Sequence, residues 1–108
     1  MAGQHVKLGR LKKTTDEAAI VRCALGKGLL RIEIWTNQKN EIVRFNLAFI
    51  NQSMCAKDHG RVLGYDNAHG MPHRHFAGSV TELAPEPYET VYNRFIAEVA
   101  ELKMRRSL

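Results

Sequence analysis

Four of the five histidines in this chain lie within seventeen residues, from His59 to His75. Imidazole has an ordinary pKa of ~6.5, so it can both accept and donate a proton near neutral pH. A cluster of this density, with other polar side chains around it, predicts a functional site. The candidate site residues are Tyr65, Asp66, Asn67, His69, His73, Arg74 and His75.

The chemistry that we favour for this cluster is metal-independent cleavage of RNA. One neutral histidine would accept the proton of a ribose 2′-hydroxyl, and a protonated histidine would donate a proton to the leaving 5′-oxygen. We assign this acid–base pair to His69 with His73 or His75. Asp66 would orient one imidazole, and Arg74 would stabilise the charge on the phosphate.

The spacing of these residues also predicts which of them share a face. Alternate residues of a strand point to opposite faces, so His73 and His75 should lie together, with Arg74 on the other side. On a regular strand Arg74 would then not reach the same phosphate. The Gly70–Pro72 bend would decide whether His69 joins the pair.

The same histidines have two other interpretations. His69, His73 and His75 could ligate a metal, with Asp66 or His59 as a fourth ligand, although no familiar zinc motif such as His-Glu-x-x-His is present. They could instead only hydrogen-bond backbone carbonyls and fix the loop. We expect a site without metal or other cofactor.

Nucleophilic catalysis is disfavoured by the residues around the candidate nucleophiles. Nothing that flanks Cys55 or Ser79 indicates an activated thiol or hydroxyl. The two cysteines of the chain also lack the spacing of a metal site, so free thiols and a cytoplasmic location are expected.

Hydrophobic periodicity predicts the elements that precede the cluster. Residues 30–35 and 43–49 alternate apolar and polar side chains, as half-buried strands do, and the turn residues 37–40 would join them into an antiparallel hairpin. Residues 15–24 fit either a helix that starts at Thr15 or a strand that turns through 26–28, and we favour the hairpin. Residues 5–13 could be an edge strand or a loose arm.

Further along, two strands and a helix are expected. Residues 51–60 read as a polar loop, and 61–66 and 74–80 read as strands. From Tyr88 the period changes to that of an amphipathic helix, and Pro87 suits its first turn. The apolar face of this helix carries Tyr88, Val91, Tyr92, Phe95, Val99 and Leu102.

Together these elements predict a single α+β domain over residues 1–108, a small antiparallel β-sheet with the C-terminal amphipathic helix packed on one face. The length suits one hydrophobic core, and the 44% hydrophobic and 25% charged residues argue against disorder. No apolar run approaches the roughly 20 residues of a membrane helix, and the first residues lack the apolar segment of a secretory signal.

The positive charge of the chain is concentrated near its N-terminus. The formal net charge is +5, and residues 1–31 hold seven basic residues against two acidic ones. Such a field attracts polyanions, so nucleic acid or an acidic protein is a candidate partner.

The segment from Gly64 to His75, Gly-Tyr-Asp-Asn-Ala-His-Gly-Met-Pro-His-Arg-His, is followed by a strand and an amphipathic helix. In this order it resembles the TumE-like toxin family of prokaryotic toxin–antitoxin systems. The resemblance is most specific over 61–76, looser over 28–50 and 86–102, and does not cover the first 25 residues. The family pattern falls on Tyr65, Asp66, Asn67, His69, Gly70, His73, Arg74 and His75.

The resemblance implies a small toxin encoded beside an antitoxin, which is usually a helix-turn-helix DNA-binding protein. It supplies this context and no mechanism. We therefore expect a toxin component with ribonuclease activity, whose partners are the cognate antitoxin and RNA and not a membrane. The alternative is a non-enzymatic module of a toxin–antitoxin pair that docks nucleic acid or protein through its basic surface. The apolar positions of 43–49 could form a core or the contact of a homodimer.

Overall fold

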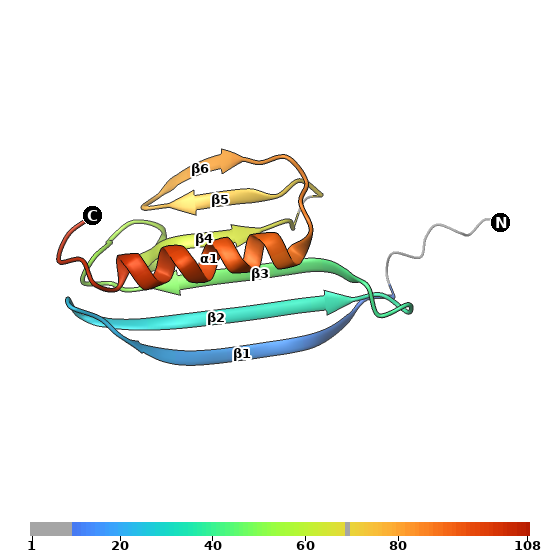
Figure 1. Ribbon diagram of the computed structural model, residues 1–108, viewed down its shortest axis with the longest axis horizontal. Helices are drawn as coiled ribbons and strands as arrows, with labels where there is room; N and C mark the ends of the chain where they lie inside the picture. Colours follow the sequence, from blue (N-terminus) through green and yellow to red (C-terminus); the bar gives the residue numbers. More distant parts are fainter. Residues whose placement is uncertain (1–9, 69) are drawn as a thin grey trace.

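The computed structural model describes residues 10–68 and 70–108, and in these ranges the chain forms six strands, one α-helix and a 3-10 turn. The strands pair antiparallel in chain order within one sheet. The helix α1 crosses one face of this sheet over β3 and β4 (Figure 1), so the α+β prediction is confirmed. The elements are β1 (Lys12–Arg22), β2 (Lys27–Thr36), β3 (Ile42–Ile50), η3 (Asp58–Gly60), β4 (Arg61–Asp66), β5 (His73–Phe76), β6 (Ser79–Glu82) and α1 (Tyr88–Leu102).

The two N-terminal hairpins follow the predicted pattern. Residues 15–24 belong mostly to β1, which pairs with β2 along its length, so the hairpin interpretation is correct and the helix alternative is wrong. The edge strand begins at Lys12, and the start of the predicted 5–13 segment lies outside the described residues. The hairpin of β2 and β3 is confirmed, with Ile34 opposite Phe45.

The predicted strand at 74–80 is wrong, because the chain reverses inside it. β5 ends at Phe76 and β6 begins at Ser79, and the two strands form a hairpin. The two turn residues, Ala77 and Gly78, have φ values of 48° and 92°. Both residues at the centre of such a tight hairpin turn have positive φ, which glycine adopts freely and alanine at a cost.

The hydrophobic core lies between the sheet and α1. β3 contributes Leu47 and Phe49. Four of the six predicted apolar residues of α1 are buried in this core, and the two tyrosines, Tyr88 and Tyr92, are partly buried against it. Tyr65 of β4 meets Phe95 of α1 edge to face, with ring centroids 6.3 Å apart. The core residues are Phe45, Leu47, Phe49, Cys55, Val62, Leu63, Tyr65, Val91, Phe95, Val99 and Leu102.

The other face of the sheet carries many charged side chains together with apolar ones such as Ile50 and Val80, and no described helix covers it. Strand alternation sends to this side the residues that lie between the core positions. We call this surface the open face. It carries Lys13 and Asp16 of β1, Arg31, Glu33 and Trp35 of β2, Arg44 and Asn46 of β3, Arg61 and Asp66 of β4, and His73 and His75 of β5.

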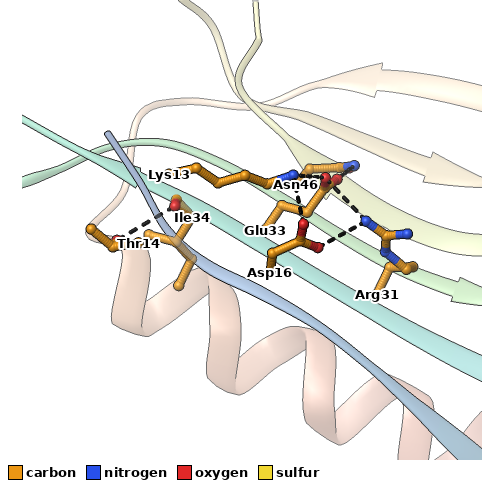
Figure 2. Close-up of polar contacts among 7 residues, drawn as sticks. All are labelled: Lys13, Thr14, Asp16, Arg31, Glu33, Ile34 and Asn46. Atoms are coloured by element: carbon orange, nitrogen blue, oxygen red, sulfur yellow. Dashed lines mark hydrogen bonds and ion pairs between the residues drawn. The ribbon is translucent and has the colours of Figure 1, made fainter. Parts of the chain in front are cut away.

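Glu33 is the centre of a charge network that joins three strands of the open face. Its carboxylate accepts hydrogen bonds from Lys13 Nζ at 2.7 Å, Arg31 Nη2 at 3.2 Å and Asn46 Nδ2 at 2.8 Å. Asp16 pairs with the same Lys13 and Arg31, each at 3.0 Å. Figure 2 shows these side chains converging on Glu33 from β1, β2 and β3. The network therefore fastens the edge strand β1 to the sheet.

This network predicts a loss of stability in acid. The hydrogen bond from Lys13 is the largest cause that holds the pKa of Glu33 below its usual value of 4.5. A carboxylate whose pKa is lowered by folding stabilises the native state above the unfolded pKa, and this contribution is lost as the pH falls through the folded pKa. Urea unfolding between pH 6 and pH 3 should show a steeper decline for the wild type than for Glu33→Gln. Parallel curves for the two proteins would contradict this.

Candidate functional site

His75 lies at the centre of a polar chain on the open face. The β4–β5 register places it opposite Gly64. His75 Nε2 is 2.8 Å from Asp66 Oδ2, and His75 Nδ1 is 3.0 Å from Arg61 Nη2. A guanidinium only donates hydrogen bonds, so Nδ1 must accept from Arg61. The proton of the neutral imidazole is therefore on Nε2 and is donated to Asp66.

Arg61 is held against the sheet by its own contacts. Its Nε donates to Asp58 Oδ2 at 2.7 Å, and its Nη1 is 3.9 Å from Asp66 Oδ2. The side chain lies across Gly64, where a Cβ atom would come within 2.8 Å of Arg61 Cδ. Glycine at position 64 thus leaves the space in which the guanidinium reaches His75.

The turn that precedes β4 has a left-handed backbone at two residues. Asp58 and His59 have φ values of 53° and 56°, the left-handed region, and neither is glycine. Aspartate and histidine adopt this region more readily than most residues other than glycine. Here this conformation accompanies the placement of the Asp58 carboxylate on Arg61.

His73 shares the open face with His75, as the alternation predicted. It lies opposite Asp66 across the β4–β5 pair and opposite Glu82 across the β5–β6 pair, and it is half-buried. No described residue hydrogen-bonds its ring. Of the two described histidines of β5, His75 is thus held by hydrogen bonds on both ring nitrogens, and His73 is not.

Arg74 lies on the opposite, helix-covered face. Its Nε donates to the Tyr65 hydroxyl at 3.1 Å, and its Nη2 pairs with Glu98 of α1 at 2.5 Å. The Tyr65 hydroxyl also donates to Glu98. Burial is the main cause that raises the pKa of Tyr65 above its usual value, and the hydrogen bond to Glu98 raises it further. The expectation that Arg74 stabilises a phosphate beside the histidines therefore needs correction. Tyr65 and Arg74 join the sheet to the helix.

Asn67 extends the pairing of β3 and β4 with its side chain. Its Oδ1 accepts from the backbone N–H of Phe45 at 2.9 Å, and its Nδ2 donates to the carbonyl of Val43 at 3.0 Å. These contacts continue the ladder beyond Asp66, where the strand ends. Asn67 therefore positions the end of β4 next to the site.

The structure brings together Asp66, His73 and His75 of the predicted site and separates Tyr65 and Arg74 from them. His69 lies outside the described residues. Sequence reasoning missed two members, Arg61 and its partner Asp58. Their charged side chains close to the histidine cluster were the only signal available.

Strand alternation also explains why Arg61 is not predicted from the sequence to lie at the site. Residue 61 is two positions from the buried Leu63, so a regular strand would turn both to the helix-covered face. The β3–β4 register shifts at this point, because Phe49 pairs with Leu63 but Ile50 pairs with Arg61. A shift of this kind is a β-bulge, which re-aims the side chain next to it. Arg61 consequently points to the open face.

The described residues hold no ready metal site. Between residues 10 and 108, with His69 excepted, no three histidine, cysteine, aspartate or glutamate side chains are grouped so that they could hold a metal ion. The predicted set of His69, His73 and His75 includes a residue outside this description. Cys23 and Cys55 are free thiols.

Comparisons of the chain with protein-family models, curated proteins and solved structures gave no match. The chemistry of the open face must therefore be inferred from its own residues. In the described ranges, the chain contains no helix with the length and apolar character needed to cross a membrane.

Proposed function

We propose that this protein is a toxin of a toxin–antitoxin system that cleaves RNA without a metal ion, with its active site on the open face. The observation that supports the proposal is the chain from Asp66 through His75 to Arg61, next to the unengaged imidazole of His73. A carboxylate that orients an imidazole, a second imidazole and a cation are the groups that metal-free phosphoryl transfer requires.

In the proposed reaction, Asp66 holds the proton on His75 Nε2, so the lone pair on Nδ1 is the basic position. Arg61 donates to this nitrogen in the free protein. When an RNA phosphate binds, Arg61 would turn its donors to the phosphate oxygens and leave Nδ1 free to accept the proton of the ribose 2′-hydroxyl. The 2′-oxygen then bonds to phosphorus as the bond to the 5′-oxygen breaks.

His73 would supply the proton that the leaving 5′-oxygen takes up. The products are a 2′,3′-cyclic phosphate and a 5′-hydroxyl end. Residues two apart on a strand are separated by about 6.6 Å, which leaves room for a phosphate between a base and an acid on opposite sides of it. His69 is the other candidate for the second imidazole.

The toxin context rests on the resemblance of residues 61–76 to TumE-like toxins. The proposed partner is the cognate antitoxin, which would block the open face or hold the toxin inactive. Expression of the protein alone should then arrest growth, and co-expression of the antitoxin encoded beside it should restore growth.

The test of the proposed activity is incubation of the purified protein with single-stranded RNA, with and without EDTA. We expect cleavage in both conditions, with 2′,3′-cyclic phosphate ends. Cleavage that EDTA abolishes would contradict metal independence, and intact RNA with a folded protein would contradict the ribonuclease. Growth arrest that survives His73→Ala and His75→Ala but is lost on replacing Lys12, Arg105 and Arg106 would favour the non-enzymatic binding module.

A further inference from the structure

A hollow on the open face connects the site at Arg61 and Asp66 to Trp35, the single tryptophan of the chain. Its volume is about 400 Å³. Residues of three adjacent strands line it, among them Glu33, Trp35, Arg44, Asn46, Arg61 and Asp66. A ligand in this hollow would therefore contact Trp35 and the proposed catalytic groups together.

Arg44 lies over the indole ring of Trp35. Its guanidinium carbon is 4.7 Å from the centroid of the indole ring, and the Arg44 side chain is exposed. Lys13 approaches the same ring, with Nζ 5.2 Å from the centroid. A guanidinium held in this way presents a flat, positively charged surface at the wall of the hollow.

Arg44 also differs from its basic neighbours in its charge partners. On the open face Lys13, Arg31 and Arg61 are each ion-paired with a carboxylate. No described carboxylate pairs with Arg44. The charges of Glu33 and Asp66 are balanced by their own partners. Of the two arginines that line the hollow, Arg44 is therefore the one without a described carboxylate partner, and it can attract an anion.

We infer that Trp35 and Arg44 form a subsite for one nucleotide of a single-stranded RNA, whose base stacks on the flat surface and whose phosphate binds the Arg44 donors. This inference rests on the proposed function and names the substrate class of the same site. Single strands expose unstacked bases, which stack on aromatic rings and guanidinium planes, whereas bases of a duplex are already stacked on each other.

The experiment uses the fluorescence of Trp35, which reports on this subsite alone because the chain has no other tryptophan. The probe is a short 2′-O-methyl oligoribonucleotide, which lacks the attacking hydroxyl and so measures binding without cleavage. We expect saturable quenching by the single strand, and at least tenfold weaker binding by the duplex of the same sequence and by an abasic strand of the same length. Equal binding by the abasic strand would overturn base stacking.

Matched variants distinguish the contribution of the planar guanidinium group of Arg44 to RNA binding from the contribution of its positive charge. Arg44→Ala and Arg44→Lys should each weaken binding of the single strand about tenfold, the loss of one stacked contact of about 1.4 kcal/mol. Arg22→Ala removes the same charge from an exposed residue of β1 and should leave binding unchanged. Arg22 lies opposite Lys27, at the end of the β1–β2 pair away from Trp35. Unchanged binding by Arg44→Lys would overturn the stacking role, and equal quenching by poly-glutamate would identify an acidic peptide site instead.

Failure of this inference can be distinguished from failure of the ribonuclease. Quenching by the 2′-O-methyl strand together with intact unmodified RNA would support the subsite and contradict the catalytic proposal. Cleavage of unmodified RNA at a rate that Arg44→Ala does not change, without quenching, would contradict the subsite and leave the ribonuclease standing.

Discussion

Replacement of His75 by alanine should lower the rate of RNA cleavage by about 10²- to 10⁴-fold, the usual contribution of a positioned general base or acid. His75 is the one described imidazole whose tautomer is set by two partners, Asp66 Oδ2 at 2.8 Å and Arg61 Nη2 at 3.0 Å. Removing it takes away the proposed base and leaves Asp66 with Arg61 as its nearest cation. Cleavage rates on a labelled oligonucleotide would measure the effect.

His73→Ala provides a second variant, because no described residue hydrogen-bonds the His73 ring and its loss should not disturb the fold. We expect a comparable loss of rate, with the limb of the pH–rate profile that belongs to the acid removed. Urea unfolding and circular dichroism would establish that both variants are folded. Full cleavage by either folded variant would contradict the assigned pair.

Arg61→Ala should lower the rate of cleavage about 10²- to 10³-fold, which is the effect of removing one donor that stabilises charge in a transition state. Arg61 lies across Gly64 with its donors at His75 and Asp58. It is therefore the arginine placed to bind a phosphate beside the histidines. Its side chain is about one-fifth exposed and is paired with Asp58, so we also expect a loss of about 1–2 kcal/mol in the free energy of unfolding. The cleavage rate should therefore be measured at a temperature where the variant is folded.

Arg74→Ala is the matched control for Arg61→Ala, since it removes the same group from the opposite face of the sheet. It should lower the free energy of unfolding by about 1–2 kcal/mol, because Tyr65 and Glu98 lose a charged hydrogen-bond partner. At a temperature where the variant is folded, its cleavage rate should match the wild type. The reverse pattern, activity lost in folded Arg74→Ala and retained in folded Arg61→Ala, would move the active site to the helix-covered face.

The elements that were predicted correctly are those whose signal is local. The stripe of α1 and the alternation in β2 and β3 come from side chains a few positions apart, so burial on one face is visible in the residues themselves. The strand expected at 74–80 failed for a different reason. Its turn includes Ala77 at a positive φ, which the residue type does not indicate.

In the candidate site, too, some relations follow from the local sequence and others do not. The sequence by itself determined that Asp66, His73 and His75 lie close in the chain, and that His73 and His75 share a face from which Arg74 is turned away. Alternation along one strand is enough to establish these relations.

Only the tertiary structure decided which cation faces the histidines. Arg61 reaches the open face because the register of β4 against β3 shifts beside it, and because residue 64 has no side chain. Arg74 is committed instead to Glu98, which is 24 positions away on the helix. The orientation of Arg61 and the pairing of Arg74 both depend on contacts between segments that are distant in the chain. The residue types along one segment therefore do not predict them.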